Sequence, residues 1–193
     1  MLTIAIPQRD VKPLAKRLID EFGGFAQVIS ADPRRLVEFD GVKVMTATTL
    51  KIVQAAAQRL AQRQVTGRSV ISSWQALIDY CQAKLAHRDT EAFRVLFLDR
   101  KNGLIADEPA TEGTVDHTPV YPREVVKRAL ELSASALILV HNHPSGDPKP
   151  SRDDIEMTRE IRKAAEALGI SIHDHLVIGR KGHASFRSLW LLA

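Results

Sequence analysis

A run of five apolar residues, Ala136–Val140 (ALILV), restricts the possible folds more than any other part of the sequence. A short unbroken apolar run is typical of a strand buried on both faces, in the middle of a sheet that helices cover. Helical patterns flank it, and we expect helices at about 122–133 and 152–168, the second ended by Gly169. The sequence therefore predicts a mixed α/β domain around this run.

Short runs rich in apolar residues supply the remaining strands. We expect them at 93–98, 104–106, 176–178 and 185–189, with an Asn-Gly hairpin turn at 101–103. A helix that begins after Ser72 or Ser73 precedes these strands.

Residues 11–64 carry three helical patterns, the second of which begins after the N-cap residue Asp32. The stretch 65–69 interrupts these patterns as a linker. We therefore expect a small helical domain over 1–66 and the α/β domain over 70–193, so the fold class is α/β (α+β).

The excess positive charge lies in the first third of the chain. Residues 1–67 hold ten Lys and Arg against six Asp and Glu, whereas the remainder is balanced and contains all seven histidines. A basic helical domain could contact nucleic acid, and ordinary solubility accounts for the same charge equally well.

The composition excludes several classes of protein. Hydrophobic residues make up 45% and charged residues 26%, so the chain is not intrinsically disordered. No apolar run approaches the roughly 20 residues of a membrane span, and the opening residues lack the pattern of a signal peptide. Cys81 is the single cysteine and allows no internal disulfide. We expect a cytoplasmic protein that does not bind a membrane.

The loop after the apolar run carries a candidate metal site. His141 and His143 point to the same side of the chain because one residue separates them. Asp154 follows in the first turn of the next predicted helix. Two imidazoles and one carboxylate can bind zinc and leave its fourth position to a water, as in catalytic sites. Ser151 and Asp154 also fit a helix capping box, so the spacing alone leaves both interpretations open.

The run HNHPSGDPKPSRDD resembles the JAMM signature of the MPN metalloprotease superfamily, in which His-x-His is followed after ten residues by Asp. The sequence HNHPSG at 141–146, with the later pair Asp174-His175, resembles the motifs of the bacterial RadC family, whose members are usually called DNA repair proteins. The resemblance implies an MPN/JAMM domain with a cytidine-deaminase-like mixed sheet flanked by helices. It also implies one zinc ion per chain, with His141, His143 and Asp154 as ligands.

The resemblance assigns two catalytic roles. Ser151 matches the serine that helps to hold the developing oxyanion, and Glu91 matches the general base that takes a proton from zinc-bound water. The implied reaction is hydrolysis of a peptide or isopeptide bond in a protein or peptide substrate, with a link to DNA repair. Weaker candidates for the base are Glu108, Glu112 and Glu124.

The pair Asp174 and His175 is expected to orient the metal ligands through hydrogen bonds, since ligating histidines usually donate their other ring N–H to a fixed partner. An alternative for this region is that His173 binds a second metal.

Residues 11–64 resemble the helix-hairpin-helix region that precedes the catalytic domain in RadC proteins. The hairpin reads Phe39-Asp40-Gly41-Val42-Lys43, so Lys43 stands where the motif has its second glycine, and Asp40 adds a negative charge. A side chain there would hinder the close backbone approach of a DNA phosphate. A plain packing domain is the alternative. If DNA binds, the expected contacts are Arg34, Arg35, Lys43 and Lys51.

Two alternatives to the peptidase are a metal-dependent nuclease and a non-catalytic DNA-binding or protein-binding adaptor. One set of two His and one Asp favours the peptidase, because nucleases more often use carboxylate-rich or paired metal sites. A homodimer is a further candidate assembly.

Overall fold

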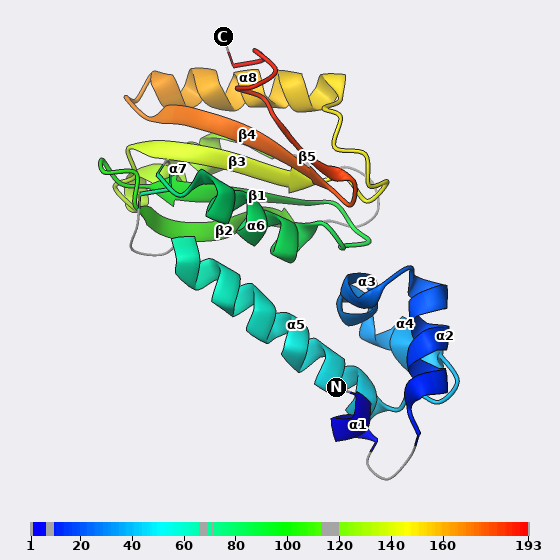
Figure 1. Cartoon of the computed structure of the whole chain (residues 1–193). Coiled ribbons are helices and arrows are strands. Elements are labelled where there is room, and N and C mark those ends of the chain that lie inside the picture. Colours follow the sequence, from blue (N-terminus) through cyan, green and yellow to red (C-terminus); the bar gives the residue numbers. More distant parts are fainter. Residues whose placement is uncertain (1, 7–9, 66–68, 71, 113–119, 193) are drawn as a thin grey trace. The chain divides into compact units, whose positions relative to one another are not determined.

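The computed structural model describes residues 2–6, 10–65, 69, 70, 72–112 and 120–192, without the side chains of residues 111 and 112. The chain divides into two compact units, Met1–Leu60 and Ala61–Ala193 (Figure 1). This division lies inside a helix, several residues before the linker predicted at 65–69, of which 66–68 are outside the described residues.

The first unit is helical. Its elements are α1 (Leu2–Ala5), α2 (Lys12–Phe22), α3 (Phe25–Ser30), α4 (Pro33–Glu38) and most of α5 (Val44–Val65). Asp32 caps α4 as predicted, because its carboxylate accepts a hydrogen bond of 2.7 Å from the backbone N–H of Arg34. Leu18, Leu36 and Leu50 are fully buried at the centre of this unit.

The second unit is built on a five-stranded sheet in the order β2-β1-β3-β4-β5, where β3 and β4 pair in parallel and the other neighbours are antiparallel. The mixed α/β prediction is confirmed. The strands are β1 (Ala92–Leu98), β2 (Leu104–Glu112), β3 (Ala136–Asn142), β4 (Ser171–Gly179) and β5 (Gly182–Ser185). The helices are α6 (Trp74–Leu85), α7 (Pro122–Glu131) and α8 (Arg152–Glu166).

The apolar run at 136–140 is the first part of β3, the central strand, which is buried along its whole length. Side chains alternate between two cores. Ile138 and Val140 pack with α6 and the last turn of α5 on one face, and Leu137 and Leu139 pack with α7 and α8 on the other. The next residue in this second series is His141, so the sheet directs it toward α8.

Three predicted strand limits are wrong. β4 begins at Ser171 rather than 176, and β2 continues to Glu112 rather than ending at 106. The strand predicted at 185–189 is absent, since β5 covers Gly182–Ser185 and the following residues form turns. The two strands predicted too short both contain a paired, buried carboxylate, Asp174 in β4 and Asp107 in β2, which interrupts the apolar pattern on which strand prediction depends. Among the described residues, no helix could cross a membrane.

Candidate metal centre

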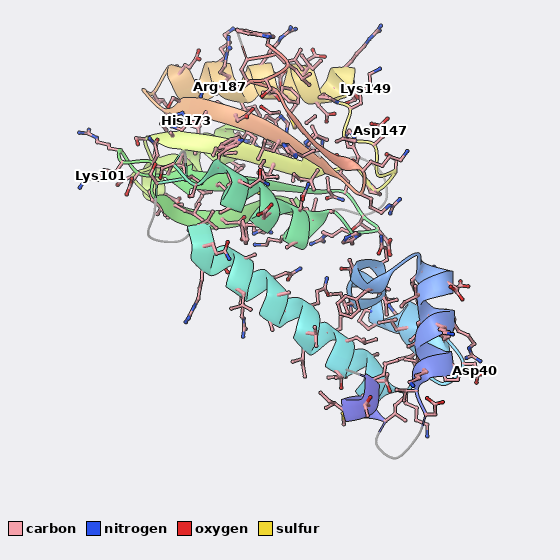
Figure 2. All side chains as sticks on the ribbon, in the orientation of Figure 1. Asp40, Lys101, Asp147, Lys149, His173 and Arg187 are labelled. Atoms are coloured by element: carbon pink, nitrogen blue, oxygen red, sulfur yellow. The ribbon has the colours of Figure 1, made fainter. Side chains whose placement is uncertain are left out.

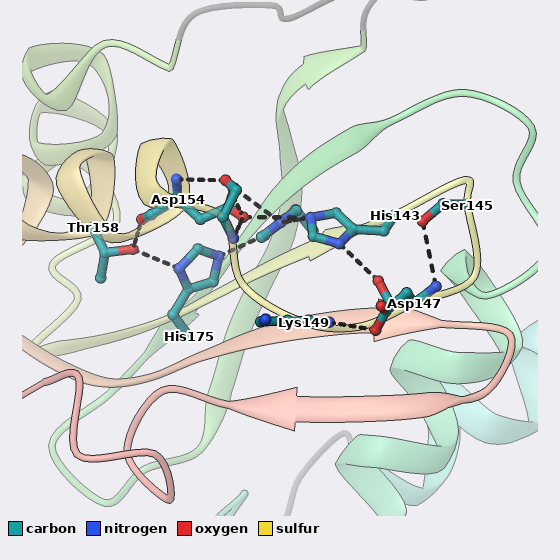
Figure 3. Close-up of polar contacts among 9 residues, drawn as sticks. His143, Ser145, Asp147, Lys149, Asp154, Thr158 and His175 are labelled. Carbon is teal, nitrogen blue, oxygen red and sulfur yellow. Dashed lines mark hydrogen bonds and ion pairs between the residues drawn. The ribbon is translucent and has the colours of Figure 1, made fainter.

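The carboxyl end of β3 and the first turn of α8 bring the three predicted ligand residues together (Figure 3). His141 Nε2 lies 3.2 Å from Asp154 Oδ1, and His143 Nε2 lies 3.4 Å from Asp154 Oδ2. The two Nε2 atoms are 3.0 Å apart. Among the described residues, this is the one group of three or more His, Cys, Asp or Glu side chains that could hold a metal ion.

The protonation of these groups suits a metal. The Nδ1 atom of His143 lies 2.9 Å from the carbonyl oxygen of Asp147. A carbonyl can only accept, so Nδ1 carries the hydrogen and the Nε2 lone pair faces the cluster. Burial alone would raise the pKa of Asp154, but the neighbouring imidazoles of His141 and His143 hold it well below its ordinary value. The donor set, two imidazole nitrogens and an ionised carboxylate, is one that binds zinc.

Ser151 and Asp154 form the capping box that the sequence allowed, and the same carboxylate faces the histidines. The Ser151 backbone N–H and hydroxyl each donate to Asp154 Oδ2 at 2.7 Å, and the Ser151 oxygen accepts from the Asp154 N–H at 3.1 Å. The two interpretations that the spacing left open are therefore compatible. The cap fixes the carboxylate and leaves Oδ1 directed toward His141.

Glu91 immediately precedes β1, and the pairing of Phe93 with His141 brings this end of β1 to the cluster. Its negative charge is one of the causes that raise the pKa of His143, after the larger effect of the Asp154 carboxylate. The buried side-chain amide of Asn142 bonds the residues on both sides of Glu91. Its oxygen accepts from Ala92 N at 2.9 Å, and its nitrogen donates to the carbonyl of Thr90 at 3.1 Å. Sequence patterns did not predict these bonds of Asn142.

The residues of the Asp174-His175 pair lie in different surroundings. His175 is fully buried, and its Nε2 atom lies 2.7 Å from His141 Nδ1. Burial lowers the pKa of His175 well below its ordinary value, so the ring is neutral. Asp174 instead accepts from the His175 N–H, the Ser185 hydroxyl and the Arg187 N–H. It therefore connects β4 to the end of β5 and the turn that follows, and it does not contact the candidate ligands.

His173 lies at the other end of β4 from the metal centre. Its ring bonds the side-chain oxygen of Asn102 at 2.7 Å. Figure 2 shows His173 near Lys101 at one end of the sheet, with Asp147 and Lys149 at the opposite end. Since the described residues give His173 no place in a metal-binding group, the structure offers nothing in favour of the second metal.

The loop that carries His143 packs against the end of β4, where the two backbone segments approach each other closely. His143 N donates to the carbonyl of Ile178 at 2.9 Å, and Lys181 N donates to the carbonyl of Gly146 at 3.1 Å. A Cβ atom on Gly179 would lie 2.4 Å from that Gly146 oxygen and 3.1 Å from Pro148 N. Only glycine fits at this position.

Replacing Gly179 by Ala is therefore expected to push the loop outward, displace the carbonyl that fixes His143, and weaken zinc binding by about 10- to 100-fold. Competition with a zinc chelator measures this affinity. Gly169→Ala is the matched control, since a Cβ there meets nothing within 4 Å although its φ of +72° is strained. The control should lose stability and keep its zinc affinity. Equal affinities in both variants would contradict the role of Gly179.

Three of the four predicted nucleic-acid contacts have partners within the first unit. Lys51 donates to the carbonyl of Ile29 and to Gln54, each at 3.0 Å. Arg35 lies over the Phe22 ring, Arg34 lies 3.5 Å from Asp32, and Lys43 is exposed.

The hairpin residue Asp40 is ion-paired with Arg17 at 3.2 Å, and Gly41 turns the chain with a φ of +91°. The guanidinium of Arg17 also donates to the carbonyl of Asp40. DNA binding through this hairpin stays a prediction.

Comparison with known proteins identifies the family. The family model of the RadC-like JAB domain matches residues 71–191. The chain is 66% identical to a UPF0758 protein of Rhodobacter capsulatus over 188 residues, which are 97% of this chain and 88% of the relative. It is 61% identical to a UPF0758 protein of Ruegeria pomeroyi over 184 residues, 95% of this chain and 82% of the relative. The chain therefore belongs to the RadC family, and its second unit carries the family's JAB domain.

Proposed function

We propose that this chain is a zinc-dependent hydrolase of the JAMM type that cleaves an amide bond in a peptide or isopeptide. One observation carries the proposal. Two imidazole Nε2 atoms and an ionised carboxylate converge, and the Nδ1 atom of each imidazole is tied to a partner behind it. Such partners keep the Nε2 lone pairs available to a cation.

His141, His143 and Asp154 would hold the zinc ion. When bound, zinc supplies a Lewis acid and makes water a nucleophile near neutral pH. Glu91 then accepts a proton from the attacking water and returns it to the leaving amine. In the present structure the Ser151 hydroxyl donates to Asp154, so it rotates away from that carboxylate when it donates to an oxyanion.

The donor set favours an amide substrate over a phosphodiester. Nucleases more often use carboxylate-rich ligands or two metals, and the described residues form a single site with two imidazoles. The link to DNA repair and the cytoplasmic location come from the family resemblance and the composition, and both stay predictions.

The first experiment is metal analysis by mass spectrometry on protein purified without a polyhistidine tag. We expect about one zinc per chain in the wild type and in the His183→Ala control, which removes an exposed histidine of β5. His143→Ala and Asp154→Asn should lose the zinc. Wild-type protein that contains no metal and takes up none from added zinc would refute the proposal, as would unchanged zinc in His143→Ala.

A further inference from the structure

Three hydrogen bonds connect one candidate ligand to the backbone of another (Figure 3). His141 Nδ1 lies 2.7 Å from His175 Nε2, and His175 Nδ1 lies 2.6 Å from the Thr158 hydroxyl. That hydroxyl donates to the carbonyl oxygen of Asp154, one helical turn earlier in α8. All four residues are buried, and Thr158 is 1% exposed. The chain of bonds therefore starts at the first ligand of the centre and ends at the third.

The carbonyl at the end of this chain fixes the direction of every bond. A carbonyl oxygen only accepts, so the single hydroxyl hydrogen of Thr158 points to Asp154. The Thr158 oxygen must then accept from His175, which places the His175 hydrogen on Nδ1. The Nε2 atom of His175 is left as an acceptor, and it takes the hydrogen on His141 Nδ1. His141 Nε2 then presents its lone pair to the cluster.

If these hydrogen bonds ran in the opposite direction, His141 Nε2 would carry a hydrogen and could not bind zinc. If His175 donated from Nε2, His141 Nδ1 would have to accept, and the His141 hydrogen would lie on Nε2, between the imidazole and Asp154. Thr158 would then donate to His175, and its oxygen would face the Asp154 carbonyl at 2.5 Å with no hydrogen between them. Two oxygens at that distance without a shared hydrogen repel each other.

We propose that Thr158 is a positioning residue that selects the Nδ1–H tautomer of His175, and through it the zinc-binding tautomer of His141. A threonine that bonds the carbonyl four residues earlier is common in helices and by itself indicates no function. Here the same hydroxyl has a second partner, His175, and that partner touches a candidate ligand. The inference rests on the metal site of the proposed function and does not depend on the reaction.

The packing around His175 leaves this ring little freedom to find another partner. Phe186 stacks on it with ring centroids 4.4 Å apart, and Phe93 meets it edge-on at 5.5 Å. Both rings are buried, and His175 has no exposed surface. Thr158 is therefore the partner that decides which nitrogen of His175 carries the hydrogen.

The test measures directly which ring nitrogen of His175 carries the hydrogen. In protein labelled with ¹⁵N at histidine, long-range ¹H–¹⁵N spectra distinguish a protonated ring nitrogen from an unprotonated one. We expect His175 to carry its hydrogen on Nδ1 in the wild type, with and without zinc. Thr158→Val keeps the shape and removes the hydroxyl, so His175 should change tautomer or exchange between the two, and zinc affinity should fall about 10- to 100-fold. Thr158→Ser restores the hydroxyl and should restore both the tautomer and the affinity.

The wild-type spectrum alone can overturn the inference, even if Thr158→Val does not fold. A His175 hydrogen on Nε2 in the wild type would refute it. So would a Thr158→Val protein with unchanged His175 signals and unchanged zinc affinity, or a Thr158→Ser protein that fails to recover either property. If the protein binds zinc and shows the expected tautomers but cleaves no amide, the hydrolase proposal fails and this inference stands.

Discussion

Replacing Glu91 by Gln is expected to leave zinc bound and to lower turnover by about 10²- to 10⁴-fold, the usual contribution of a general base. Glutamine has nearly the same shape as glutamate but cannot take a proton from water. Zinc should remain because Glu91 is outside the group of His141, His143 and Asp154 that would hold it. The expected result is therefore a loaded but inactive protein.

The measurement can proceed without a known substrate. A mixture of peptides and lysine-linked isopeptides is incubated in H₂¹⁸O, and mass spectrometry detects new carboxylates that contain one ¹⁸O atom. Glu108→Gln and Glu124→Gln are the matched controls, since both were weaker candidates for the base. Full activity in Glu91→Gln would refute its role, and a loss seen in Glu108→Gln instead would transfer the role there. Cleavage of DNA by the wild type, with no peptide cleaved, would replace the peptidase proposal with the nuclease.

The central strand and the ligand loop could be predicted because their signals are local. The run at 136–140 is apolar without interruption, and such a run has few alternatives to a doubly buried strand. His141 and His143 follow it directly, so the direction of their side chains depends on the strand alone. The structure brings Asp154 to them through a capping box that the sequence also contained.

Residues whose roles depend on distant partners could not be found this way. Thr158 resembles any threonine of an amphipathic helix until β4 places His175 against it. Gly179 resembles a turn glycine, and its importance comes from the backbone of Gly146 in a loop far away in the sequence. The only local signal for Asn142 was its place between two histidines. Sequence patterns report burial and periodicity, whereas these roles require tertiary contacts.

The early end predicted for β2 has the same cause. The prediction ends this strand at 106, just before the charged residues Asp107 and Glu108. In the structure they continue β2 and face opposite sides of the sheet. Glu108 pairs with Arg128 of α7 at 2.7 Å, with both side chains partly exposed. Asp107 faces α6, where a buried charge is stabilised by groups that the local sequence does not reveal.

Three side chains bond the buried carboxylate of Asp107. Its carboxylate lies 2.6 Å from Arg94 of β1 and 2.6 Å from Lys84 of α6, and the Tyr80 hydroxyl also bonds it. The Asp107 side chain is 2% exposed and that of Arg94 is 8% exposed. Arg94 further donates to the Asp107 carbonyl at 2.9 Å. The cluster therefore connects the edge strand β2 both to β1 and to α6.

Removing this carboxylate is expected to be costly because it leaves Arg94 with little access to water and without its ion-pair partner. Breaking one side of a buried ion pair typically costs about 3–5 kcal/mol, and we expect Asp107→Asn to lower the free energy of unfolding of the second unit by that amount. Glu108→Gln breaks the partly exposed pair with Arg128 on the opposite face of the same strand. Its cost should be at most about 1 kcal/mol.

Urea unfolding followed by tryptophan fluorescence measures both variants, because Trp74 and Trp190 are the two tryptophans of the chain and both lie in the second unit.

The pH dependence gives an independent check. Burial raises the pKa of Asp107, but Arg94, Lys84 and Tyr80 together bring it below its ordinary value of 3.8. A lowered carboxyl pKa stabilises the fold above the unfolded value and loses that effect as pH falls through the folded one. The difference between wild type and Asp107→Asn should therefore be constant near pH 7 and shrink below about pH 4. Equal costs for the two variants, or a difference that does not change with acid, would show that the charge of Asp107 does not hold the edge strand in place.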